Sequence, residues 1–259
     1  MATDQVWGIS MVRNESDILP SVLGHMTRQV DHVLVADNLS TDDTPDILAA
    51  AGVEVVIDDD PAYRQSEKMT ALAARARDAG AAWVVPFDAD EIWHTLNGQT
   101  VGDFLRDQHD TDVVVAHLFD HYTTDLDDLT IPDPVRRMTW RRPTPGALPK
   151  VACRTHPDLV IGMGNHNADY GPHRTVVHRD GLMVRHYPYR SVGQFIRKAR
   201  QGAAALAATD LHRSIGAHWR QYGRTLDEHG ETALAEHYRA HFHYPDPADA
   251  LLICDPAPL

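Results

Sequence analysis

The sequence predicts an α/β protein with a doubly wound, mostly parallel sheet flanked by helices, followed by a helical C-terminal extension. Short β-branched apolar runs alternate with helix-like pieces through the first half, at the spacing of βαβ units. These apolar runs are nearly continuous, as in parallel strands that are covered on both faces. From about residue 191 the pattern is mainly helical.

The strands of the first half are expected at five places. The fourth run, "AAWVVPF", contains Pro86. Proline cannot donate a ladder hydrogen bond, so Pro86 should mark the end of its strand. The expected strands cover residues 6–12, 32–37, 53–57, 81–87 and 112–118.

Helices are expected between these strands, and the first lies within residues 15–29. Residues 44–52 offer Thr44 as N-cap, a proline at the first helical position and Gly52 as the C-terminal stop. Residues 66–80 carry one apolar face, which consists of Met69, Leu72, Ala73 and Ala76.

The character of the chain changes near residue 120, where proline and charged residues become frequent. Strands are expected again at 147–153 and 175–186, and helices at 191–208, 214–228 and 231–243. We therefore expect three regions: a ligand-binding half at 1–120, a second half of the same domain at 121–190, and a helical extension at 191–259.

Composition and charge exclude several classes of protein. The chain has 259 residues and a formal net charge of −13. A charge of this sign argues against nucleic acid as the main partner. We see no signal peptide and no apolar segment long enough to span a membrane. Two cysteines are too few for a disulfide framework, so a cytoplasmic setting is expected.

Acidic clusters follow the second, third and fourth strands: "ADNLSTDD", "DDDP" and "DADE". Ligands of open α/β sheets bind at the carboxyl ends of the strands, so this position carries information. The bare Asp-x-Asp motif does not, because it occurs four times and 30 aspartates give about three by chance. Only the strand context distinguishes Asp88 and Asp90 from the other matches.

Asp88 and Asp90 are the candidate metal ligands. Residues spaced by two on an extended segment point the same way, so both carboxylates could share one ion. Oxygen ligands suit Mg²⁺ or Mn²⁺, often together with substrate phosphates. On spacing alone, a solvated acidic turn is the favoured interpretation.

Three segments together resemble the nucleotide-sugar domain of family 2 glycosyltransferases with the GT-A fold, a Rossmann-like sheet. They are "GISMVRNESDILPSVLGHM", "VLVADNLSTDDTPDIL" and "EKMTALAARARDAGAAWVVPFDADEIW". The resemblance spans residues 6–95 and is looser through 150–200. It implies a metal-dependent enzyme that uses Mn²⁺ or Mg²⁺. Such an enzyme moves a sugar from a nucleotide-diphospho-sugar, expected to be UDP-linked, to an acceptor hydroxyl with inversion.

The resemblance also implies roles for single residues. Asp88 and Asp90 match the family's Asp-x-Asp, which holds the metal on the donor diphosphate. A third metal ligand is expected from a histidine, with His186 preferred and His166 as its neighbour. The other donor-binding candidates are Met11, Arg13, Asp37, Asn38 and Lys68.

Inverting transfer needs a general base for the acceptor hydroxyl. Asp169 is the preferred candidate, from its place after the turn "GNHNA", and Asp120 and Glu91 are the alternatives. Arg185, Arg190, Arg197 and Lys198 could bring positive charge near a phosphate.

Two other functions stay open. A nucleotidyltransferase would share the sheet and the acids, although "ISMVRNESD" lacks the glycine-rich loop that a triphosphate needs. A catalytically silent nucleotide-sugar-binding module would share the fold. The acceptor could be a saccharide, lipid, peptide or small metabolite.

Overall fold

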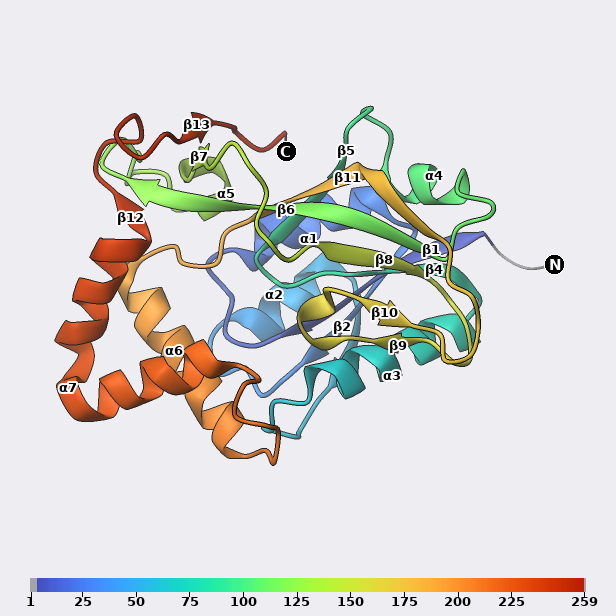
Figure 1. Ribbon diagram of the computed structural model, residues 1–259, viewed down its shortest axis with the longest axis horizontal. Coiled ribbons are helices and arrows are strands. Elements are labelled where there is room, and N and C mark those ends of the chain that lie inside the picture. Colours follow the sequence, from blue (N-terminus) through green and yellow to red (C-terminus); the bar gives the residue numbers. More distant parts are fainter. Residues whose placement is uncertain (1–3, 259) are drawn as a thin grey trace.

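The computed structural model of the chain describes residues 4–258 and contains a curled central sheet with helices on both faces (Figure 1). Four neighbouring strands of this sheet are parallel, in the order β3-β2-β1-β4. They are β1 (Gln5–Val12), β2 (His32–Asp37), β3 (Glu54–Ile57) and β4 (Ala81–Pro86). The strand expected at 81–87 does end at its proline.

The other half of the sheet is mixed. Strand β8 (Lys150–Arg154) is antiparallel to both β4 and β6 (Val113–Thr124), so β4 and β6 point the same way. Strand β11 (Val177–His186) is parallel to β6 and antiparallel to β5 (Glu91–Thr95). The carboxyl ends of β1 to β4, β6 and β11 therefore all point in one direction.

The helices of the first half cover the two faces of the sheet. Helix α1 (Leu19–Gln29), α2 (Thr44–Ala51) and α4 (Val101–Arg106) contribute to one apolar core. Helix α3 (Gln65–Asp78) packs on the opposite face in a second core. The expected apolar face of α3 is confirmed, since Met69, Leu72, Ala73 and Ala76 are all buried.

The C-terminal part is helical, as expected, and lies beside the carboxyl ends of the strands (Figure 1). It consists of α6 (Val192–Ala207) and α7 (Ala217–His241) around an aromatic cluster. Two helices were expected in place of α7, and the backbone breaks between them at Gly230, whose φ is 75°. Two short strands return to the sheet: β12 (His243–Tyr244) pairs with β6, and β13 (Ile253–Cys254) with β7 (Trp140–Arg141).

Several local expectations need correction. Thr44 does not cap its helix, because its hydroxyl accepts a hydrogen bond from the amide of Glu15 across the β1–α1 loop. Strand β5 and helix α4 were not expected, and the strand expected at 112–118 extends to Thr124. The remaining elements are short: α5 (Pro134–Arg137), β9 (Val160–Ile161), the 3₁₀ turn η1 (Met163–Asn165) and β10 (Ala168–Asp169). Within residues 4–258, none of the helices combines the length and apolar character that crossing a membrane requires.

A buried arginine joins the C-terminal part to the first loop. Arg190, 2% exposed, lies just before α6 and donates to Asp17 at 2.8 Å and to the Glu15 carboxylate. Its Nη1 also donates to the Tyr187 carbonyl at 3.0 Å. Charges that are out of water need such partners, so removing one member leaves the other uncompensated.

We expect Arg190→Met to lower the free energy of unfolding by about 3–5 kcal/mol, because the buried Glu15 carboxylate loses its closest charge partner. Urea denaturation measures this loss. The matched control is Arg200→Met, whose ion pair with Glu231 is exposed and should contribute less than about 1 kcal/mol. Equal stability of the two variants would contradict the anchoring role.

Candidate active site

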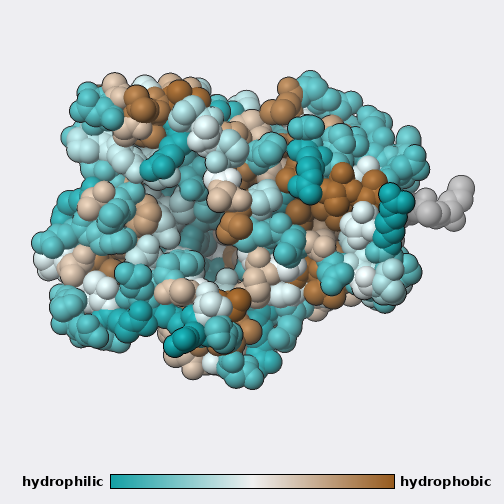
Figure 2. All heavy atoms as spheres, in the orientation of Figure 1, coloured by the Kyte–Doolittle hydropathy of each residue, from teal (hydrophilic) through white to brown (hydrophobic). Residues whose placement is uncertain are grey.

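A pocket of about 360 Å³ opens at the carboxyl ends of the parallel strands. Figure 2 shows this face of the molecule hollowed between the helical C-terminal part and the sheet. Strand ends form its floor, the segment around η1 forms one wall, and α6 with the start of α7 forms the other. Ligands of open α/β sheets bind at such an edge.

The acids after β4 lie on a turn rather than on extended chain. The amide of Glu91 donates to the Asp88 carbonyl, and the Asp88 amide donates back to the Glu91 carboxylate at 3.1 Å. Glu91 is fully buried and also accepts from the indole of Trp93. Asp88 and Asp90 line the pocket, whereas Glu91 lies behind it and holds the turn.

A buried lysine compensates the first of these acids. Lys150, with a side chain that is 3% exposed, lies 2.5 Å from Asp88 Oδ2 and 2.6 Å from Glu91 Oε1. Burial alone lowers the pKa of Lys150, but the two carboxylates outweigh this effect and raise it. Lys150 reaches this edge because it is the first residue of antiparallel β8, which starts where its parallel neighbours end.

Asp90 is 2% exposed and lies among cations. The Lys198 ammonium of α6 contacts its Oδ2, Arg190 lies 3.8 Å away, and His186 Nε2 lies 3.6 Å from Oδ1. Burial raises the pKa of Asp90, but the charges of Lys198, His186 and Arg190 outweigh this and hold the pKa well below its usual range. Asp90 is therefore ionised.

His186 ends β11 between two carboxylates. Its Nδ1 hydrogen-bonds Asp120 Oδ1 at 2.7 Å, and its Nε2 faces Asp90. Burial lowers the pKa of His186, but Asp90 and Asp120 outweigh this effect and raise it above the usual value. Asp120 is adjacent because β11 pairs with β6 in a register that sets these two residues side by side.

The second predicted histidine also lines the pocket, on the wall formed by η1. His166 Nδ1 hydrogen-bonds the Pro149 carbonyl at 2.7 Å, so the proton is on Nδ1 and Nε2 keeps its lone pair. The neighbouring Asn165 donates its amide to Asp88 Oδ1 at 3.1 Å, as Gln65 of α3 does at 3.3 Å.

The predicted donor-binding residues divide into two groups. Met11, Arg13 and Asn38, at the ends of β1 and β2, line the pocket. Asp37 and Lys68 do not appear among the lining residues. Asp37 is buried and accepts from the Ser40 amide at 3.3 Å, while Lys68 lies 2.7 Å from Asp58 Oδ2 in the layer behind Asn38.

The predicted bases occupy different places. Asp120 is hydrogen-bonded to His186, which lines the pocket. Asp169 is exposed on β10 and accepts a hydrogen bond from the Gly171 amide. Several residues that line the pocket were not predicted from the sequence: Tyr63, Gln65, Lys150, Pro188, Tyr189, His218 and Trp219. For Lys150 one signal was available, since the chain has only three lysines and this one directly precedes an apolar strand.

The donor set fits a divalent cation. A carboxylate oxygen and an imidazole nitrogen are acceptable to Mn²⁺, and Asp90 Oδ1 faces His186 Nε2 at the pocket surface. Asp120 holds the other ring nitrogen, which is the usual partner arrangement of a metal-binding histidine.

The raised pKa of His186 should make the stability of the chain depend on pH. Its protonated form is stabilised on folding, so this contribution is fully present below about pH 6.5 and is lost as pH rises through the raised pKa. Urea titrations in a chelator between pH 5.5 and 9 should show this loss in the wild type and not in His186→Asn. Parallel pH profiles of the two proteins would contradict it.

The chain is similar to parts of several known proteins. A TPR repeat-containing protein of Synechococcus elongatus is 34% identical over 103 residues, which are 38% of this chain and 25% of that protein. A glucosyl-3-phosphoglycerate synthase from Mycobacterium tuberculosis, solved with Mn²⁺, uridine diphosphate and glucosyl-3-phosphoglycerate, is 19% identical, with a TM-score of 0.35. The match covers 58% of this chain and 57% of the synthase. A further mycobacterial protein is 15% identical, with a TM-score of 0.41 over 81% of this chain and 76% of its own.

The chain thus spans about a quarter of the curated relative and about half of the synthase. The model of one family, Glycosyl transferase family 2, matches residues 9–149, which is more than half of the chain. That range runs from β1 to the residue before Lys150 and includes the turn with Asp88 and Asp90. The α/β fold that the sequence predicted is confirmed. The chain belongs to glycosyl transferase family 2.

Proposed function

We propose that this chain transfers a sugar from a nucleotide-diphospho-sugar, UDP-linked, to an acceptor hydroxyl, with a divalent metal ion. The observation that carries the proposal is the set formed by Asp90, His186 and Lys198 at the carboxyl edge of the sheet. A diphosphate needs positive charge, and a metal needs anionic or imidazole ligands. Both requirements are met within one pocket. A cytoplasmic location stays a prediction.

The donor is proposed to lie along the strand ends. Met11, Arg13 and Asn38 would contact the nucleoside. Lys150 contacts Asp88 and Lys198 contacts Asp90, and we propose that the diphosphate lies beside these two pairs. These lysines neutralise carboxylates in the ligand-free chain. They could turn toward phosphate oxygens once a metal ion satisfies the acids.

Asp90 and His186 are proposed to hold Mn²⁺ or Mg²⁺, with Asp88 and His166 beside them. A bound ion would supply positive charge to the leaving diphosphate and so stabilise the transition state. The chain's own contribution is orientation, because Asp120 fixes the ring of His186 and Arg190 lies behind Asp90.

The acceptor is proposed to enter beside α6 and α7. Tyr189, Pro188, His218 and Trp219 form this wall, and aromatic faces suit the apolar side of a sugar ring. A saccharide acceptor is therefore favoured. Of the predicted bases, Asp120 is better supported than Asp169, because it hydrogen-bonds a pocket residue and Asp169 is exposed on β10.

We expect UDP and Mn²⁺ together to raise the melting temperature by more than the sum of their separate effects, because an ion held by Asp90 and His186 would supply positive charge for the diphosphate. Asp90→Asn should lose this synergy and the transfer activity while keeping its circular dichroism spectrum. Slow Mn²⁺-dependent hydrolysis of UDP-sugars is the matching activity assay.

The same screen separates the other functions. Pyrophosphate release from a nucleoside triphosphate, without sugar hydrolysis, would indicate a nucleotidyltransferase. Synergy with neither hydrolysis nor transfer would indicate a silent binding module. Absence of synergy for every nucleoside diphosphate would reject the donor site itself.

Substitutions of the two candidate bases, Asp120 and Asp169, should affect sugar transfer differently. Asp120→Asn should lower transfer at least about tenfold and weaken activation by Mn²⁺, because the ring of His186 loses its partner. Asp169→Asn should keep transfer within about twofold of the wild type. Rates at varied Mn²⁺ concentration test both, and a larger loss in Asp169→Asn would restore it as the preferred base.

A further inference from the structure

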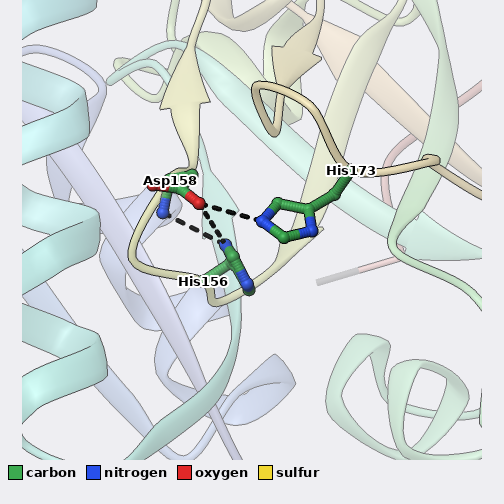
Figure 3. A group of neighbouring side chains, drawn as sticks. All are labelled: His156, Asp158 and His173. Carbon is green, nitrogen blue, oxygen red and sulfur yellow. Dashed lines mark hydrogen bonds and ion pairs between the residues drawn. The ribbon is translucent and has the colours of Figure 1, made fainter.

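A second group of metal-ligand side chains lies outside the pocket. His156, Asp158 and His173 point toward one another from two neighbouring loops, and we call them the His–Asp cluster (Figure 3). His156 and Asp158 follow β8, and His173 follows β10. Each offers one ligand atom, and these three atoms all lie within 4.8 Å of one another. We propose that the His–Asp cluster binds a transition-metal ion, Zn²⁺ by preference.

The spacing suits tetrahedral zinc. Ligand atoms about 2.0–2.1 Å from the ion in a tetrahedron are about 3.3 Å from each other. Asp158 Oδ2 lies 3.0 Å from His173 Nε2 and 3.7 Å from His156 Nδ1, so the two distances bracket this value. Two imidazoles and one carboxylate are a ligand set that zinc accepts, with water in the fourth position.

The electrostatic environment leaves the carboxylate available. Among the described residues, the two imidazoles are the only basic groups within ion-pair distance of Asp158. The nearby Arg154 instead donates to the carbonyls of Gln108 and Thr111. His156 Nδ1 accepts from the Asp158 amide at 3.1 Å, which places the ring proton on Nε2 and a lone pair toward the cluster. A cation would replace that amide as the partner of the lone pair.

The loops that carry the ligands are already fixed. Tyr170, 4% exposed, donates to the carbonyls of Asp112 and Arg154, and Thr155 donates to the Ala81 carbonyl. The His173 amide donates to the Tyr170 carbonyl. Ligands held by such contacts lose little freedom when an ion binds, and this lowers the cost of binding.

The position of the cluster gives the ion a structural role. His156 and His173 are the two ends of an excursion of the chain that includes β9, η1 and β10. The far end of this excursion contributes Gly164 and His166 to the pocket wall, and Asn165 to Asp88. An ion at the cluster would fasten the ends of the excursion together. The site does not depend on the proposed sugar transfer.

Cobalt absorption tests the proposal on the untagged chain of residues 1–259. We expect Co²⁺ to bind with visible d–d bands that Zn²⁺ abolishes by displacement. His156→Ala, His173→Ala and Asp158→Asn should each weaken this binding at least about tenfold. The matched control is His229→Ala, which removes an exposed histidine beside a carboxylate on α7 and should bind as the wild type does.

Asp90→Asn separates this site from the pocket. It should keep the Co²⁺ bands, and adding His173→Ala to it should remove them. The double variant is needed because the pocket of His173→Ala alone could still hold a divalent ion. Zn²⁺ should slow amide hydrogen exchange in residues 157–172 of Asp90→Asn. Bands that persist when each of the three cluster substitutions is added to Asp90→Asn, or that vanish in Asp90→Asn alone, would overturn the proposal.

Discussion

The carboxyl edge of the sheet depends on the contact of one buried lysine with the acids of the β4–β5 turn. Lys150 contacts Asp88 and Glu91 at 2.5 and 2.6 Å, and the charge of buried Lys150 could not be buried there without a partner. Two amide donors complete the environment of Asp88, and the Trp93 indole serves Glu91. The turn that presents Asp90 to the pocket is therefore built on compensated charge.

This contact follows from the direction of one strand. Parallel strands all end at the same edge, so their last residues meet there, and so do the first residues of an antiparallel neighbour. Strand β8 is that neighbour, inserted between β4 and β6. The chain uses this position for a lysine, and the same logic sets His186 opposite both Glu91 and Asp120.

The use of lysine in this chain has a pattern. There are three lysines in 259 residues, and each contacts an acid at or near this edge: Lys68 contacts Asp58, Lys150 contacts Asp88, and Lys198 contacts Asp90. Away from this edge the chain uses arginine in ion pairs such as those of Arg75 with Glu54 and Arg106 with Asp31. A compact ammonium with three donors fits where several oxygens converge from different directions, whereas a planar guanidinium suits paired oxygens.

Local sequence was enough to predict the parallel strands, the core face of α3 and the position of Asp88 and Asp90 on a strand end. Apolar runs, helix stops and proline act over a few residues, so one chain reveals them. The contact of Lys150 with the acids could not be predicted in this way, because it depends on the direction of β8. That direction is set by pairing between residues more than 60 positions apart. Strand β5 was not predicted, because its sequence "EIWHT" is short and directly follows the acidic residues. The placements of Asp120 and Asp169 likewise depend on the register of β11 and on the excursion before it.

The pairing of Lys198 with Asp90 has a consequence for the thermodynamics of ligand binding. An anionic ligand and its metal ion would bind where Lys198 and Asp90 already form an ion pair. Each new contact to the ligand or the ion would therefore replace a contact of that pair. Much of the enthalpy then cancels, and the measured heat should understate the number of contacts formed. Affinity would also respond less to ionic strength than at an unpaired cation, because Asp90 already compensates the charge of Lys198 before the ligand arrives.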